Sequence, residues 1–184
     1  GQLQAALTEA GIAPRAVTVV ALTHTHVDHV SGLVDDLGGP AFPLAARVFV
    51  AVEEVMALRA MPRMLPFLHA LMPLEQGDGV FPGVTAINAP GHSAGHMAYL
   101  VEGRLLIWGD LVHHAALQFR DPSLGWRYDD DLDRARASRL ALMEQAVEAG
   151  WLVAGAHLPD PGIGWIERAG AGYAFRPVAL QAGR

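Results

Sequence analysis

The segment His24-Thr25-His26-Val27-Asp28-His29 constrains what this 184-residue chain can fold into more than any other part of it. It directly follows Val17–Leu22, a β-branched and apolar run that predicts a buried strand. Because side chains alternate along an extended backbone, His24 and His26 should emerge on one side, and Asp28 and His29 can then turn toward a neighbouring position. This spacing favours two adjacent metal ions over one, and the alternative, a surface loop that is polar by chance, is the weaker interpretation.

Three further candidate residues follow predicted strands in the same way. They are His92 after Val84–Ala89, Asp110 after Arg104–Trp108 and His157 after Trp151–Ala156. Loops at the carboxyl ends of strands are where α/β proteins commonly place their chemistry. We therefore group these three residues with the histidine motif.

The remaining pattern alternates strands and helices, so we expect an α/β (α+β) chain that folds as a single domain over residues 1–184. The most regular helix is expected over Asp129–Gly150, where acidic residues crowd the first turn and apolar residues recur at helical spacing. The other predicted elements are helices over Leu3–Ala10 and Ser31–Leu37, a strand over Arg47–Ala51 with a helical stretch through Arg59, a hairpin of Met97–Val101 with Arg104–Trp108, and a closing hairpin within Trp165–Val178.

Composition argues against several functional classes. The net charge is −6, and the 13 basic residues, all of them Arg, are scattered rather than gathered into the basic patch typical of a nucleic-acid binder. No apolar run approaches the roughly 18 residues that span a bilayer. The chain has no cysteine, which excludes disulfides, thiolate nucleophiles and thiolate metal ligands. Its alanine, glycine and arginine content is typical of a GC-rich bacterial gene, and the compartment stays open because any export signal would precede Gly1.

The histidine motif and the later donors, in this order, resemble the signature of the metallo-β-lactamase superfamily. The matching segments are His24-Thr25-His26-Val27-Asp28-His29, Gly91-His92-Ser93-Ala94-Gly95-His96, Gly109-Asp110 and Ala156-His157. The resemblance implies an αββα sandwich. Since only 23 residues precede His24, we expect this chain to lack the N-terminal strands of that fold.

The resemblance also implies a set of ligands for two divalent metal ions, with a hydroxide between the ions as the nucleophile. Imidazole and carboxylate groups suit zinc, iron or manganese, and we expect zinc. The implied assignment is His24, His26 and His92 for one ion, Asp28, His29 and His157 for the other, and Asp110 as the bridge between them.

Four residues are candidates for direct roles in catalysis. Asp110 would orient the hydroxide and help to protonate the leaving group. Asp28 is a second candidate catalytic carboxylate. His96 is expected to fix a ligand or the bridging loop by a hydrogen bond, or else to be an ordinary buried histidine. His113, three residues after Asp110, either faces the substrate or has a structural role. His69 is expected to be structural.

Within the superfamily, Leu106–His113 followed by Gln118-Phe119 looks closest to the methyl parathion hydrolase-like and N-acyl homoserine lactonase-like branch. Lactonases commonly carry tyrosine where this chain has His113. The implied function is a dinuclear metal-dependent hydrolase that attacks an ester, a lactone or a phosphotriester. The alternatives are a glyoxalase II-like thioesterase or a metallo-oxidoreductase on the same fold, or a metal-binding fragment without turnover.

The methionine-rich segment Met56–Met72 has two interpretations. It is either an ordinary part of the core or an adaptable apolar wall over the metal ions. The second interpretation implies a small-molecule substrate with an apolar portion, which is the partner we expect. We expect no nucleic acid as a partner, and a homodimer remains open.

Overall fold

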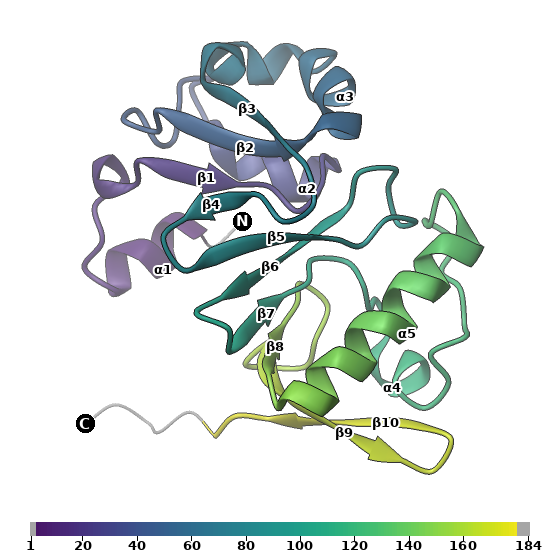
Figure 1. Ribbon diagram of the computed structural model, residues 1–184. Coiled ribbons are helices and arrows are strands. Elements are labelled where there is room, and N and C mark those ends of the chain that lie inside the picture. The colour runs from purple at the N-terminus through teal and green to yellow at the C-terminus, as the bar shows by residue number, and fades with distance from the viewer. Residues whose placement is uncertain (1–2, 180–184) are drawn as a thin grey trace. The chain divides into compact units, whose positions relative to one another are not determined.

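The computed structural model describes residues 3–179. The chain folds as two compact units that divide between Glu75 and Gln76, and each unit is built on its own β-sheet (Figure 1). Helical segments alternate with strands in the first unit, whereas in the second unit two helices stand between a run of four strands and a run of three. The chain is mixed α/β, as the sequence predicts.

The first unit contains a three-stranded sheet with the order β1-β2-β3, in which both neighbouring pairs are parallel. Parallel neighbours need crossover connections, and helical segments lie on both of them. The strands are β1 (Val19–Ala21), β2 (Arg47–Ala51) and β3 (Leu71–Leu74), and the helical segments are α1 (Leu3–Glu9), η1 (Pro14–Ala16), α2 (Val27–Val30), η2 (Ser31–Leu33), η3 (Val52–Glu54), α3 (Val55–Arg59) and η4 (Pro62–Ala70), where η denotes a 3-10 helix.

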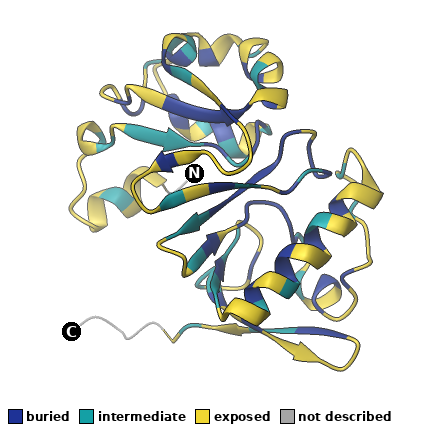
Figure 2. Ribbon diagram, viewed as in Figure 1, coloured by how far each residue is buried: buried dark blue, intermediate teal, exposed yellow. Residues whose placement is uncertain are grey.

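The core of the first unit lies around β2, whose side chains are almost all buried (Figure 2). Val48 and Val50 have no exposed surface, and Met64 of η4 packs in the same cluster. Met56 and Met72 are exposed. The methionine-rich segment therefore contributes to an ordinary core through Met64, while its other methionines divide between the core and the surface.

The predicted helix over Ser31–Leu37 is wrong. The helix is a single turn, α2, that begins at Val27, and the chain leaves helical structure after η2. Asp35 explains the early end, because its Oδ1 accepts hydrogen bonds from the backbone N–H groups of Leu37 and Gly39 at 2.9 and 2.8 Å. Such a side-chain-closed turn competes directly with helix continuation.

The second unit contains a seven-stranded sheet with the order β10-β9-β8-β7-β6-β5-β4. All neighbouring pairs are antiparallel except β7 and β8, which are parallel. Both predicted hairpins are confirmed, as β6–β7 and as β9–β10. The elements are β4 (Gly79–Phe81), β5 (Val84–Asn88), β6 (Met97–Val101), β7 (Leu105–Ile107), α4 (Ala115–Gln118), α5 (Leu132–Ala149), β8 (Leu152–Ala154), β9 (Ile163–Ala169) and β10 (Gly172–Pro177).

Helix α5 connects the two parallel strands and packs on the sheet, with its buried side turned inward (Figure 2). Leu142 and Met143 lie in one core cluster with Leu106 of β7 and other residues of the sheet. The helix begins at Leu132, three residues later than predicted, because the side chain of Asp131 caps it by accepting the N–H of Arg134. It ends at the C-cap Gly150, whose φ of 66° favours glycine.

Candidate metal centre

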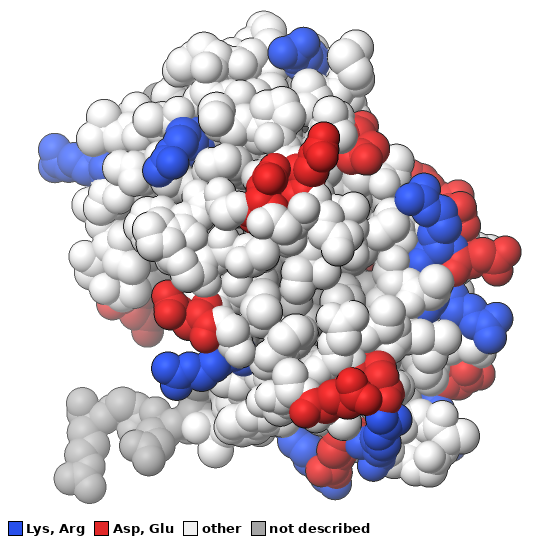
Figure 3. All heavy atoms as spheres, in the orientation of Figure 1, with Lys and Arg blue, Asp and Glu red and all other residues white. Residues whose placement is uncertain are grey.

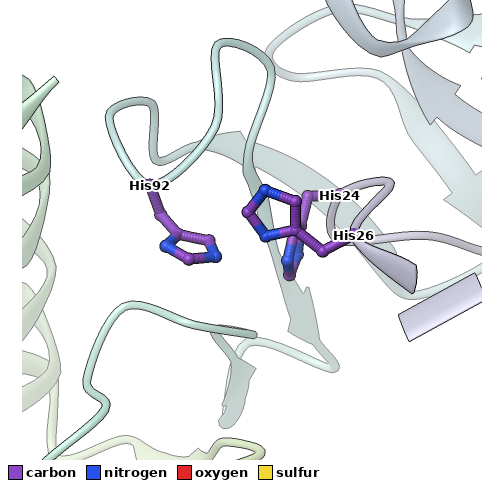
Figure 4. A group of neighbouring side chains, drawn as sticks. All are labelled: His24, His26 and His92. Atoms are coloured by element: carbon purple, nitrogen blue, oxygen red, sulfur yellow. The ribbon is translucent and has the colours of Figure 1, made fainter. Parts of the chain in front are cut away.

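The first unit supplies the histidine motif directly after β1. His24 and His26 lie on extended backbone, and their rings meet edge to face with centroids 4.6 Å apart. The ring of His29, one helical turn farther along, lies 4.1 Å from that of His24. The rings of His24 and His26 thus lie side by side, as their alternation along the backbone predicts. Figure 4 shows His24 and His26 on this segment.

Asp28 and His29 both lie on the short helix α2 rather than on extended chain. The Nε2 atom of His29 is 3.6 Å from Oδ2 of Asp28. The Asp28 side chain is 70% exposed, whereas that of His29 is 16% exposed. The helical turn therefore groups these two donors with each other, as expected, and leaves the carboxylate open to solvent.

A buried carboxylate holds the backbone of the histidine motif in place. Glu54, at the end of η3, accepts the backbone N–H of Thr25 at 3.2 Å and also the Thr25 hydroxyl. Both residues are only 4% exposed. Since Thr25 stands between His24 and His26, this pair of hydrogen bonds fixes the segment that carries both imidazoles. Nothing in the spacing of the sequence pointed to Glu54.

The second unit gathers its donors around one oxygen atom. Oδ2 of Asp110 lies 3.1 Å from Nε2 of His157, 3.3 Å from Nε2 of His113 and 3.5 Å from Nε2 of His92. Asp110 is buried, at 4% exposure. The structure thus brings together the three donors that the sequence assigns to this part of the chain, and adds His113 to them.

The pairing of β7 with β8 explains why Asp110 and His157 meet. The two strands are parallel neighbours, so their carboxyl ends lie at the same edge of the sheet. Asp110 follows β7 and His157 follows β8 by the same number of residues. Gly155 lets the two loops approach closely, because a Cβ atom there would lie 2.2 Å from Nε1 of Trp108.

His96 positions the backbone of Asp110. Its Nε2 accepts the N–H of Asp110 at 3.0 Å, and its Nδ1 lies 3.1 Å from the carbonyl oxygen of Ala89. A ring that accepts at Nε2 carries its proton at Nδ1, so it donates to that carbonyl. Both ring nitrogens are occupied in this way, which fits the expected role of fixing the bridging loop.

His92 leaves β5 on a tight turn, where Figure 4 shows its ring. Its Nδ1 lies 3.1 Å from Oδ1 of Asp129, whose side chain is fully buried. Burial by itself would raise the pKa of Asp129, but hydrogen bonds with His92 and the Trp126 N–H and the charge of Arg139 lower it below its ordinary value. Sequence reasoning missed Asp129, because it stands in an acidic run that predicts a helix start.

His113 is held on both sides by aromatic rings. It stacks on Trp126 with centroids 5.5 Å apart and on His157 with centroids 5.1 Å apart. Its backbone N–H donates to Oε1 of Gln118 at 2.8 Å. His114 and His69 are exposed. Sequence reasoning did not single out Trp126.

The donors of each unit fit a divalent cation chemically. All are imidazole nitrogens or carboxylate oxygens, which are the ligands that zinc and its neighbours take in proteins without cysteine. Three imidazoles facing one carboxylate oxygen offer lone pairs and negative charge together. Within the second unit, His92, His113 and Asp129 also each place a donor atom within 4.8 Å of the others.

A family model described as the metallo-beta-lactamase superfamily matches residues 1–157. The chain belongs to this superfamily. The match confirms the resemblance, the fold type and the class expected from the sequence, a metal-dependent hydrolase. Family and donor set together support divalent metal ions as the cofactor.

Two solved structures are similar over almost the whole chain. The dizinc quorum-quenching lactonase AidC, in complex with a product, is 27% identical with a TM-score of 0.83, covering 98% of this chain and 71% of its own. The hydrolase AbOPH of the beta-lactamase superfamily is 28% identical with a TM-score of 0.87 and the same coverage.

A relative found by sequence comparison aligns with a smaller part of this chain than the two solved structures do. A ribonuclease from Thermus thermophilus is 32% identical over 133 residues, which are 62% of this chain. The aligned part is only 30% of the ribonuclease, so the chain spans less than a third of that relative's length. Among the described residues, no helix is both long and apolar enough to cross a membrane.

Proposed function

We propose that this chain is a dinuclear zinc hydrolase that opens lactones or related esters. The observation that carries the proposal is the convergence of imidazole nitrogens on Oδ2 of Asp110, within a chain of a superfamily of metal-dependent hydrolases. The similarity to a dizinc lactonase over 98% of the chain supports zinc as the metal and a lactone as the substrate.

The proposed metal ligands are the residues expected from the sequence. The family match runs from residue 1 to 157 and so crosses the boundary between the units, which supports treating residues 1–184 as a single functional domain. The proposed ligands are His24, His26 and His92 for one ion, Asp28, His29 and His157 for the other, and Asp110 for both.

Bound zinc ions would supply hydroxide at neutral pH and polarise the substrate oxygen. The residues of the chain would do the rest. Asp110 would orient the attacking water and pass the proton of that water to the leaving oxygen. His96 would hold Asp110 in place by accepting its backbone N–H. His113, whose Nε2 lies 3.3 Å from Oδ2 of Asp110, would hydrogen-bond the substrate oxygen where lactonases commonly use tyrosine.

Trp126 supports a substrate with an apolar portion. Its ring stacks on that of His113, and Leu124 and Tyr128, two residues before and after it, are 41% and 54% exposed. An acyl chain or a planar group could pack on this surface while the ester reaches His113. A second copy of the chain is a further proposed partner.

Phosphodiester cleavage is the second candidate function, because one relative is a ribonuclease. The charge of this chain speaks against it. Acidic side chains stand beside the basic ones on the face shown in Figure 3, and the net charge is −6. An RNA-binding surface normally carries an excess of basic side chains that neutralise phosphates.

The test combines metal content with a substrate panel. The chain is loaded with zinc, iron or manganese, and its metal content is measured. It is then assayed on N-hexanoyl homoserine lactone, an aryl ester, a phosphotriester, a thioester and RNA, and for oxygen reduction. We expect two zinc ions per chain and the highest kcat/KM on the lactone. Sedimentation of the same sample tests the homodimer.

His157→Ala is the matching variant, and His69→Ala, which changes an exposed histidine outside the donor cluster, is its control. We expect His157→Ala to lose one zinc ion and turnover, and His69→Ala to keep both. Two bound zinc ions without hydrolysis of any substrate would overturn the enzyme proposal in favour of a metal-binding fragment. A preference for the thioester, for RNA or for oxygen reduction with iron would overturn the substrate proposal.

A further inference from the structure

Arg139 is a charged residue buried in the middle of the second unit. It lies on α5 with 1% of its surface exposed. Its guanidinium donates to the carbonyl oxygens of Leu111 at 2.8 Å, Pro122 at 3.0 Å and Leu124 at 2.7 Å. Burying a cation is costly unless the cation is paired and hydrogen-bonded. A buried arginine is therefore expected to have a specific structural or functional role.

The pairing partner of Arg139 is Asp129. Nη2 of Arg139 lies 3.6 Å from Oδ2 of Asp129, and both side chains are almost fully buried. The same oxygen accepts the N–H of Trp126 at 2.9 Å, and the other oxygen lies 3.1 Å from Nδ1 of His92. A continuous chain of contacts thus runs from the guanidinium through the carboxylate to the imidazole.

The backbone of His92 is tied to the same helix. The carbonyl oxygen of Gly91 accepts the N–H of Asp131 at 2.9 Å, and that of His92 accepts the N–H of Asp130 at 3.2 Å. The hydroxyl of Ser138 donates to the carbonyl oxygen of Pro90 at 2.7 Å. Hydrogen bonds from residues at the start of α5 therefore hold both the turn that carries His92 and the His92 ring.

We propose that Asp129 and Arg139 are positioning residues that fix the tautomer and orientation of His92, so that its Nε2 is presented for metal binding. The inference rests on the proposed function, because it takes His92 as a metal ligand. A carboxylate that accepts from Nδ1 puts the proton there and leaves the lone pair on Nε2. Arg139, 3.6 Å from Oδ2 of that carboxylate, holds it in place beside the ring.

Direct metal binding by Asp129 is the competing role, because Asp129, His92 and His113 all have donor atoms within 4.8 Å. The contacts of Asp129 speak against it. One oxygen faces Nδ1 of His92, and the other faces the Trp126 N–H and Arg139. Each oxygen is thus directed at a hydrogen donor of the chain.

The test uses Asp129→Asn and Arg139→Met, with Glu144→Gln as control. Glu144 is a carboxylate that also pairs with an arginine, Arg168, but at the surface. Zinc affinity is measured by competition with a chromophoric chelator, using the metal alone. Partners of ligating histidines typically change metal affinity about 10- to 100-fold, and we expect a weakening of that size for one ion in both variants and none in the control.

The second measurement is made on the metal-free chain, so it does not depend on turnover or on bound zinc. Nitrogen-15 NMR of the histidine rings reports which nitrogen of His92 carries the proton. We expect the Nδ1–H tautomer in the unchanged chain and a mixture in Asp129→Asn. Thermal unfolding of the same metal-free samples checks that each variant is folded.

An unchanged tautomer with unchanged zinc affinity in both variants would overturn the inference. Complete loss of one zinc ion in Asp129→Asn with an unchanged tautomer would overturn it as well, since Asp129 would then be a ligand. The variants could change zinc affinity and the His92 tautomer as expected while the unchanged chain hydrolyses no substrate. That result would support the inference and contradict only the proposed function.

Discussion

Asp110 is the residue of the second unit around which the candidate metal ligands gather. Its buried carboxylate faces three imidazoles through one oxygen, and its backbone N–H is held by a fourth, His96. In a low-dielectric surrounding such a group is costly unless positive charge or donors accompany it. The local arrangement at this residue is therefore built around a positive charge, as a bound cation would provide.

The second residue on which the histidine motif depends is Glu54. Glu54→Leu would leave the N–H and the hydroxyl of Thr25 without their acceptor in a buried place. Each unsatisfied buried donor costs about 1–3 kcal/mol, so we expect the free energy of unfolding in urea to fall by about 2–6 kcal/mol for the two. Glu54→Gln should lose less, because its amide oxygen can accept both hydrogen bonds.

Glu53→Leu is the matched control, since Glu53 is the exposed neighbour in the same 3-10 helix. It should unfold at nearly the same urea concentration as the unchanged chain. Equal destabilisation by Glu53→Leu and Glu54→Leu would mean that the hydrogen bonds to Thr25 do not stabilise the motif.

At this scale the sequence predicted the donors and one residue that supports them, His96, but not Asp129 or Glu54. The residues His24, His92 and Asp110 could be selected because chemical type and spacing are visible in the chain itself. Asp129 lies 37 residues from His92, and Glu54 lies 29 residues from Thr25. Contacts over such separations are created by the fold and leave no local pattern.

Elements were predicted best where apolar periodicity was long and worst where strands were short. The long helix α5 and the hairpin of β6 and β7 follow from pattern and turn chemistry. β3 was missed because it contains Pro73, which a strand tolerates at the edge of a sheet, where β3 lies. β4 was missed because it is only three residues long and begins with Gly79.

At the element scale, Gly155 sets the spacing between the loops after β7 and β8. A methyl group there would lie 2.2 Å from Nε1 of Trp108, which is fully buried, and 3.3 Å from the carbonyl oxygen of Gly109. Overpacking of this kind costs about 1–3 kcal/mol. We expect Gly155→Ala to lower the free energy of unfolding by about that amount and to weaken zinc binding through Asp110 and His157.

Gly79→Ala provides the comparison, because a Cβ atom at Gly79 would meet nothing within 4 Å. It should leave zinc affinity and stability nearly unchanged. If Gly155→Ala binds zinc and unfolds like Gly79→Ala, the close approach of the two loops has no bearing on the donors.

For the whole molecule, composition and element pattern were sufficient to predict a mixed α/β chain, and the motif order was sufficient to predict its superfamily. The division of the chain at Glu75 was not predicted. No linker composition marks it, because the segment that follows β3 leads through a short turn into β4. Two compact units can be joined without any Pro-rich or Ser-rich stretch between them.

The proposed metal centre makes a prediction about the stability of the whole chain. Zinc that binds the folded chain should raise its unfolding temperature. We expect calorimetry to give a higher midpoint with excess zinc than with a chelator. A ligand at 100 times its Kd stabilises by about 2.7 kcal/mol, which should be visible as a higher Tm.

Magnesium is the control for this experiment, because it prefers oxygen ligands and should have little effect on a site rich in imidazole. Equal midpoints with zinc, with magnesium and with chelator would contradict the proposed zinc centre. His69→Ala should behave like the unchanged chain in all three conditions.

The single parallel pair in the larger sheet has a consequence for redesign. The connection from β7 to β8 is long: it leaves the sheet after β7, where Asp110 lies, and includes α4 and α5 before the chain reaches β8 and then His157. Its near part, around α4, holds the backbone of His113 through Gln118 and contacts β10 through Phe119, whereas its far part carries Asp129 and Arg139 beside His92. A graft that replaces only the near part should therefore alter the surroundings of His113, while a graft that also exchanges the far part should disturb how His92 is held.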